Sequence, residues 1–222
     1  MEVVVVLAVA GVALLIWHMF QVAEKRRKML AAWAAGHGLT FDKERDKSFH
    51  SRFEGLECVN EGHSRYAYNI MRGDWGELPI VAFDYHYASG SGDDESDYHF
   101  SAVIIQCPFP LKPLRVRPEG FFDKIGAFFG FDDIDFESAE FSCKFHVKAA
   151  DKRWAYDIIH QRMMEYLMTK PGFSLQLDER NIIVWDNSVF DADEFEAAAV
   201  HVRNVIDLIP EYVVEQQVGG VA

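Results

Sequence analysis

The tripeptide Asp-Tyr-His occurs twice in a short stretch, at residues 84–86 and 97–99 of FDYHYASGSGDDESDYHF. Carboxylates and imidazoles are side chains that bind zinc and similar divalent ions, and the same groups transfer protons in catalysis. The stretch therefore offers four candidate metal ligands or acid–base groups: Asp84, His86, Asp97 and His99. A metal-binding protein or an enzyme that uses these four residues is one function that the sequence allows.

A β-hairpin explains the same stretch without a ligand, because a glycine-rich turn separates the two copies. If the turn centres on residues 91–92, two cross-strand pairs form, Asp84 with His99 and His86 with Asp97. Tyr85 and Tyr98 then lie on the opposite, apolar face. Opposed residues on a hairpin lie in a row and do not converge on one point. We therefore favour a solvated face with two Asp–His pairs over a metal site.

The remaining chemical motifs are incomplete. Counting from Asp132, the acidic segment FDDIDFESAEF has Glu137 where a calcium-binding EF-hand loop needs glycine. The GSG at 90–92 lacks the lysine of a phosphate-binding loop, and no Gly-x-Ser-x-Gly elbow is present. Three cysteines without CxxC spacing indicate neither a disulfide framework nor a zinc knuckle: Cys58, Cys107 and Cys143. We expect no catalytic residues and no cofactor.

The amino-terminal segment is strongly apolar. Val3 to Phe20, VVVVLAVAGVALLIWHMF, is 18 residues without a formal charge, close to the length that crosses a bilayer. A cleaved signal peptide would have basic residues before a shorter apolar run, whereas Glu2 is the only charge ahead of this one. We predict an uncleaved transmembrane helix that contacts the lipid bilayer, continued by a stalk, with residues 1–36 forming the anchor.

A basic collar follows the predicted span: Lys25, Arg26, Arg27 and Lys28. Basic residues flank membrane spans on the cytoplasmic side, so the collar is interpreted as a topology signal. The expected location is the cell membrane (inner or plasma membrane), with a single span, the amino terminus outside and the soluble domain in the cytoplasm.

The elements after the anchor fall into two groups. Strand-like runs over 39–45, 64–72, 79–88 and 98–107 have short connections and predict an antiparallel meander. Four prolines from 108 to 118 exclude a central strand there and predict a crossing segment. We therefore divide the chain into a β-meander subdomain (37–112), an α+β subdomain (113–215) packed on it as one unit, and a frayed tail (216–222).

The second group mixes helices and strands. We expect an aromatic helix over 119–129, a strand pair over 133–147, a helix capped by Asp151, a hairpin over 178–181, and a final helix that begins at Asp191 or Asp193 and ends at Pro210. The predicted fold class is α+β, with an N-terminal transmembrane helix followed by a mainly antiparallel sheet domain with three amphipathic helices.

The composition limits the partners. The chain has 222 residues, of which half are hydrophobic and 14% aromatic, so it can form a packed core. Its formal charge of −13 excludes a nucleic-acid partner, because such binding needs clustered Lys and Arg. An acidic surface suits a basic protein partner.

Several strings are similar to those of a known group of proteins: RPEGFFDKIGAFFGFDDIDFESAEFS, FDYHY, RWAYD, RMMEYL and IPEYV. Together with the apolar segment and the EKRRK collar, the chain resembles an uncharacterised family of bacterial single-pass membrane-anchored proteins. The resemblance implies an anchored cytoplasmic α+β domain of unknown function, and it supplies no catalytic or binding residues.

From these observations we expect a membrane-tethered cytoplasmic domain that binds an unknown protein partner or a second copy of itself and has no catalytic activity. Two alternatives stay open. The first is the metal-binding protein or enzyme built on residues 84, 86, 97 and 99. The second is a lipid-sensing domain with an apolar pocket under the aromatic helix.

Overall fold

The computed structural model describes residues 2–119, 133–170 and 172–219, with side chains from Gly11 onward except that of Asp93. The predicted helix over 119–129 therefore lies almost entirely outside the described residues. The helices are α1 (Glu2–Gly36), α2 (Ala139–Ser142), α3 (Lys152–Ile158), α4 (Gln161–Met168), α5 (Ala192–Leu208) and α6 (Glu211–Gly219), with short 3-10 turns η1 (Phe49–Arg52), η2 (Glu57–Val59) and η3 (Gly92–Asp94). The strands are β1 (Thr40–Asp42), β2 (His63–Trp75), β3 (Leu78–Ser89), β4 (Ser96–Pro118), β5 (Phe145–Ala149) and β6 (Ser174–Asp186).

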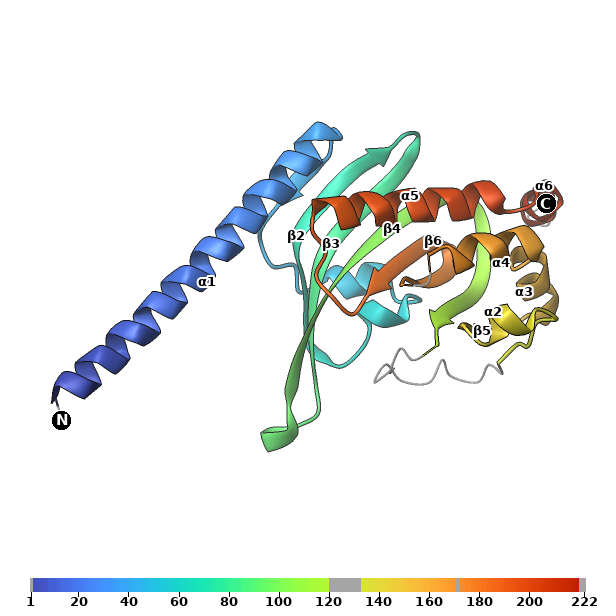
Figure 1. The fold of residues 1–222 in the computed structure, drawn as a ribbon. Coiled ribbons are helices and arrows are strands. Elements are labelled where there is room, and N and C mark those ends of the chain that lie inside the picture. The colour runs from blue at the N-terminus through green and yellow to red at the C-terminus, as the bar shows by residue number, and fades with distance from the viewer. Residues whose placement is uncertain (1, 120–132, 171, 220–222) are drawn as a thin grey trace.

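The strands form one antiparallel sheet, and the α+β fold class is confirmed (Figure 1). Strands β1 to β4 follow one another as the predicted meander. Residues 114–116 of β4 pair with both β5 and β6, so these two strands lie on opposite edges of β4. Strand β4 is therefore common to both halves of the sheet.

The proline-rich segment is part of β4, which has neighbours on both edges, so the prediction that the prolines exclude a central strand is wrong. The pairing of β4 with β6 is irregular between Gln106 and Leu114, and this interval contains Pro108, Pro110 and Pro113. A proline lacks the N–H that a regular ladder requires, and irregular pairing removes that requirement. The predicted subdomain boundary at 112/113 falls inside this strand.

The predicted hairpin over 178–181 is a single bent strand instead. Both halves of β6 pair with β4, and Glu179, with φ of 49°, lies at the bend between them. Because β4 is itself irregular at the same level, β6 follows it and does not fold back on itself. The positive φ provides the local change of direction.

The helices agree partly with the predictions. Asp151 caps α3, and Asp191 forms a capping box with Glu194 at the start of α5, as expected. The predicted strand pair over 133–147 is instead α2 followed by β5, and the helix after Asp151 is broken between α3 and α4. Helix α6 extends to Gly219, into the segment predicted as a frayed tail.

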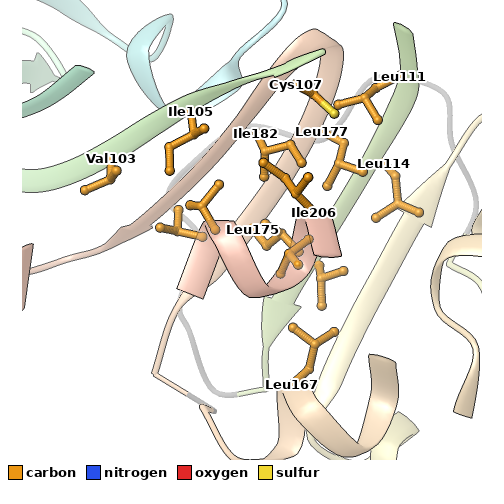
Figure 2. Close-up of a cluster of buried hydrophobic side chains, with 14 of the residues drawn as sticks. Val103, Ile105, Cys107, Leu111, Leu114, Leu167, Leu175, Leu177, Ile182 and Ile206 are labelled. Atoms are coloured by element: carbon orange, nitrogen blue, oxygen red, sulfur yellow. The ribbon is translucent and has the colours of Figure 1, made fainter. Parts of the chain in front are cut away.

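Each face of the sheet carries its own hydrophobic cluster. We call the two faces the α1 face and the loop face. The α1 face, with Ile80 and Ala82, packs against α1 and α3 to α6. The loop face, with Phe83 and Tyr85, packs against η1 and η2. Figure 2 shows part of the first cluster, where side chains of β4 and β6 meet Leu167 of α4 and Ile206 of α5. Burial of each such side chain stabilises the fold by about 1.5–3 kcal/mol.

Helix α1 packs on the domain only through its carboxyl-terminal part. Leu30 and Ala34 are fully buried, whereas the amino-terminal half projects away from the domain (Figure 1). Among the residues whose side chains are described, no helix is long and apolar enough to cross a membrane. The predicted span, Val3 to Phe20, includes residues 3–10, whose side chains lie outside the described set.

Candidate functional site

The hairpin that carries the doubled tripeptide has a register different from the predicted one. His86 lies opposite His99, Asp84 opposite Ser101, and Asp97 opposite Ala88. The two predicted Asp–His pairs are therefore wrong by a shift of two residues. The physical reason is the connection: the ladder ends at the pair of residues 89 and 96, and η3 occupies part of the longer loop between them.

A shift of two residues preserves the faces of the hairpin, because side chains alternate with a period of two. The histidines and aspartates share the α1 face, and Tyr85 lies on the loop face as predicted. The expectation that the polar face is solvated is wrong for Asp84, which is fully buried, and for His86, which is 7% exposed.

The buried carboxylate of Asp84 accepts four hydrogen bonds. Arg26 of α1 donates two of them, from Nη1 at 2.5 Å and from Nη2 at 2.8 Å. Asn69 of β2 donates at 2.7 Å, and the hydroxyl of Ser101 in β4 donates at 2.5 Å. The guanidinium of Arg26 thus balances the negative charge, and both carboxylate oxygens are hydrogen-bonded. A buried charge is tolerated under these conditions.

The same junction includes the segment before α5. Nη2 of Arg26 also donates to the carbonyl oxygen of Phe190 at 2.7 Å, and the backbone N–H of Phe190 donates to the hydroxyl of Ser101 at 2.9 Å. Arg26 is one of the four collar residues, so part of the collar binds the sheet. We call the group Arg26, Asp84, Asn69, Ser101 and Phe190 the α1 junction.

Local backbone geometry places Asn69 in this junction. Its φ of 48° lies in the left-handed region, at an irregularity in the pairing of β2 with β3. Asparagine tolerates this conformation better than most residues, and a bulge redirects a side chain out of the regular alternation. The amide of Asn69 thereby reaches Asp84.

The electrostatics of the junction follow from burial and pairing. Burial acts to lower the pKa of Arg26, but the hydrogen bond and the charge of Asp84 outweigh it, and the pKa is raised above its usual value. Loss of one partner of such a buried pair costs about 3–5 kcal/mol, because the other charge is left without compensation.

Next to the junction lie His86 and His99, with ring centroids 4.8 Å apart. His86 has an acceptor at each ring nitrogen, the carbonyl oxygen of Ser64 at 3.0 Å from Nδ1 and Asp97 at 2.8 Å from Nε2. The Nδ1 atom of His99 lies 3.1 Å from the hydroxyl of Tyr68. Burial and the neighbouring His86 lower the pKa of His99.

These contacts determine which of the four candidate ligands come together. His86 contacts both Asp97 and His99, whereas the carboxylate of Asp84 is directed at Arg26. In the part of the chain that the structure describes, no group of three or more His, Cys, Asp or Glu side chains is arranged to hold a metal ion.

A second contact holds α1 at its carboxyl-terminal end. The indole nitrogen of Trp33 donates to Glu196 of α5 at 3.0 Å, and Nε2 of His37 lies 3.0 Å from the same carboxylate. The ring of His37 also stacks on Trp75, with centroids 4.9 Å apart. The sequence offered no signal for this contact, since its residues come from distant parts of the chain.

The apolar pocket of the lipid-sensing alternative was predicted under the aromatic helix and stays a prediction. An open cavity of about 250 Å³ is lined by Asp135, Phe136, Glu137, Tyr156, Ile159 and Met164. The aromatic helix that was predicted to cover such a pocket lies outside the described residues.

No protein-family model and no curated protein sequence matches the chain. Among solved structures, the crystal structure of the mycobacterial trehalose monomycolate transport factor A, TtfA, is similar, with a TM-score of 0.60 and 11% identity. The match covers 83% of this chain and 96% of TtfA. The two proteins share a fold. The bacterial family that the sequence resembles stays a prediction.

Proposed function

We propose that this protein is a membrane-tethered interaction domain, in which α1 is the anchor and the α1 junction fixes the domain relative to it. One observation carries the proposal. The large apolar side chains along the projecting part of α1 are 55–70% exposed: Val12, Leu14, Leu15, Ile16, Trp17, Met19, Phe20 and Val22. A helix that exposes so much apolar surface needs a lipid or protein partner.

The direction of these side chains favours lipid. Residues 14–17 are consecutive and all exposed, so they point to every side of the helix. A single protein partner covers one side, whereas lipid surrounds a helix. Together with the preceding sequence VVVVLAVA, the apolar run reaches 18 residues.

The basic collar supports an orientation with the domain in the cytoplasm and the amino terminus outside the cell membrane. Lys25 and Lys28 are exposed on α1, where they can meet anionic headgroups. Arg26 has two roles in this proposal. Its charge is part of the basic collar, and its side chain binds Asp84 in the α1 junction.

In this proposal the domain binds a protein. The polar groups of the junction are engaged with one another, as in a structural joint, and the similar fold of TtfA belongs to a protein described as a transport factor. The partner is a protein of unknown identity or a second copy of this chain.

Membrane extraction at alkaline pH tests the anchor. The wild-type protein should stay in the membrane pellet, and a variant with Leu14→Arg and Leu15→Arg should be released, because charged side chains at the centre of a span are costly. Val200→Arg in α5, where the native side chain is exposed on the domain, is the matched control and should stay in the pellet. Release of the wild-type protein would contradict the proposal.

The interaction role needs a separate measurement. Crosslinking in intact membranes, followed by affinity purification, should return a reproducible protein partner or a crosslinked dimer. A reporter fused after Ala222 tests the orientation, since activity restricted to the outside of the cell would reverse it.

A further inference from the structure

We propose that the end of the β3–β4 hairpin beyond the α1 junction rests on the lipid headgroups of the membrane that α1 enters. We call this part, residues 85–100, the distal hairpin. The face turned to the lipid is the α1 face, with Tyr66, Tyr68 and His99. The inference rests on the proposed function, because it requires α1 to be in the membrane.

The first step compares two lengths. Both are measured from the contact of Arg26 with Asp84, where α1 and β3 lie side by side. Phe20, at the end of the apolar run, lies six residues from Arg26, about 9 Å along a helix at ~1.5 Å per residue. Gly90, in the hairpin loop, lies six residues beyond Asp84, about 20 Å along a strand at ~3.3 Å per residue. Measured along its own axis, the hairpin is therefore longer beyond the junction than the part of α1 between the junction and the apolar run.

The second step is direction. Figure 1 shows the amino-terminal half of α1 and the distal hairpin projecting from the same side of the domain and diverging. If the hairpin followed α1, its loop, with Asp94 and Glu95, would enter the hydrocarbon, which such charges do not tolerate. Because the hairpin diverges from α1 (Figure 1), the proposed contact places its loop at the level of the headgroups. Since α1 leaves the sheet on the α1 face, that face is the one turned to the membrane.

The third step is the chemistry of this face. The ring of Tyr66 stacks on His86 at 4.5 Å, and the guanidinium of Arg45 lies 4.5 Å from the centroid of Tyr66. The hydroxyl of Tyr68 bonds His99, whose side chain is exposed. Tyrosine and arginine combine an apolar body with a polar end, and such residues are enriched where hydrocarbon meets water.

The charges specify the kind of lipid. His86 lies 2.8 Å from Asp97, and His63 at the start of β2 lies 3.6 Å from Glu95, so each of these carboxylates lies beside an imidazole. The exposed carboxylates of Asp94 and Glu95 suit the ammonium of zwitterionic headgroups, and the guanidinium of Arg45 beside Tyr66 suits their phosphate. A strongly anionic surface repels the acidic loop. We therefore assign a zwitterionic phospholipid layer as the partner.

Spin-label depth measurements test the inference on the full chain in phosphatidylcholine vesicles. Cys143→Ser removes the exposed cysteine, and Cys58 and Cys107 are buried away from the reagent. Single labels are introduced by Leu15→Cys on α1, by His99→Cys on the α1 face and by Ser96→Cys on the opposite face of the same strand. Glu215→Cys on α6 gives an aqueous reference.

The Leu15 label should show the oxygen access of hydrocarbon. Collisions of the His99 label with a water-soluble nickel chelate should be several-fold fewer than those of the labels at 96 and 215. Asp97→Cys, where the native side chain is 70% exposed, should repeat the result at a position that perturbs folding little. Vesicles rich in phosphatidylglycerol should reduce this protection and leave the Leu15 label unchanged.

Two outcomes separate the inference from the proposed function. If the labels at 97 and 99 are as accessible as the reference while the Leu15 label is in hydrocarbon, the hairpin contact is wrong and the anchor stands. If the Leu15 label is itself in water, the anchor fails. Protection at 97 and 99 that occurs in native membranes but not in pure lipid would assign the face to a protein and overturn the inference.

Discussion

Arg26 and Asp84 lie 58 residues apart in the chain and share two charge-assisted hydrogen bonds in the seam between α1 and β3. The carboxylate also binds Asn69 and Ser101, and the guanidinium binds the carbonyl of Phe190. One ion pair thus connects α1 with three neighbouring strands and with the segment before α5. Together with the contacts of Trp33 and His37 with Glu196, this pair holds α1 against the domain.

Loss of the guanidinium should destabilise the protein. Arg26→Met leaves the buried carboxylate of Asp84 with two neutral donors, and we expect the free energy of unfolding to fall by about 3 kcal/mol. Arg26→Lys retains the charge but not the fork of two donors, so its loss should be smaller. Chemical unfolding of the full chain in detergent, followed by tryptophan fluorescence, measures both.

Arg27→Met is the matched control for this prediction. Its pair with Glu24 is within α1, and the two side chains are 38% and 36% exposed. Exposed pairs at this spacing contribute about 0.5 kcal/mol or less. Equal effects of the two arginine substitutions would show that Asp84 does not need Arg26.

Addition of zinc should not stabilise the protein. The oxygens of Asp84 are occupied by four donors, and Nδ1 of His99 faces the hydroxyl of Tyr68. A ligand that binds the native state raises the unfolding midpoint in proportion to its affinity, so a metal site would be visible. We expect equal midpoints with zinc and with a chelator. A zinc-dependent rise that is lost in His86→Ala and His99→Ala would restore the metal hypothesis.

Buried His201 should make the stability depend on pH below neutrality. Burial, and then Lys170, lowers its pKa from 6.5 to about 4. Between these values the unfolded chain binds more protons than the folded chain. The contribution of neutral His201 to the free energy of unfolding is therefore complete above pH 6.5. It is lost as the pH falls toward 4, at about 1.4 kcal/mol per pH unit.

His201→Phe removes the titrating group, while Tyr166 retains a hydrogen bond from Asn204. From pH 6.5 to pH 5, the wild-type free energy of unfolding should fall by about 2 kcal/mol more than that of the variant. Parallel pH profiles would contradict the assignment of a neutral buried imidazole.

Gly62 should not accept a side chain. Its φ is 58°, and an added Cβ would lie 2.1 Å from the carbonyl oxygen of Ala88. Gly62→Ala should cost about 2–3 kcal/mol, since left-handed strain and overpacking add. Gly36→Ala, at a position with no atom within 4 Å of an added Cβ, should change the stability by less than about 1 kcal/mol. Thermal unfolding compares the two variants.

Features that depend on near neighbours follow from the sequence. Asp151 and Asp191 cap helices as predicted, because a cap joins a side chain to an N–H three residues ahead. The two faces of the hairpin also follow, because strand alternation does not depend on the loop.

Features that depend on distant partners do not follow. The hairpin register depends on the length of the loop at residues 90–95, and composition does not determine that length. The two halves of β6 have the sequence pattern of the two strands of a hairpin, but each half pairs with β4. The proline segment is tolerated in β4 because its pairing with β6 is irregular, which is a property of two strands together.

The same limit applies to the candidate site. The sequence identified Asp84 and His86 as polar positions but assigned them to water, and it interpreted Arg26 only as a topology signal. The one available hint was a carboxylate inside a strand of large apolar residues, IVAFDYHYA. Such a residue needs a cation, and its local sequence does not indicate which.

The junction also has an order of assembly. Arg26 is synthesised 164 residues before Phe190, whose carbonyl completes its hydrogen bonds. At translation rates of about 5–20 residues per second, the interval is on the order of ten seconds or more. During this time α1 leaves the ribosome before the sheet that holds it exists. The helix is therefore complete first, and the sheet and the segment before α5 later assemble against it.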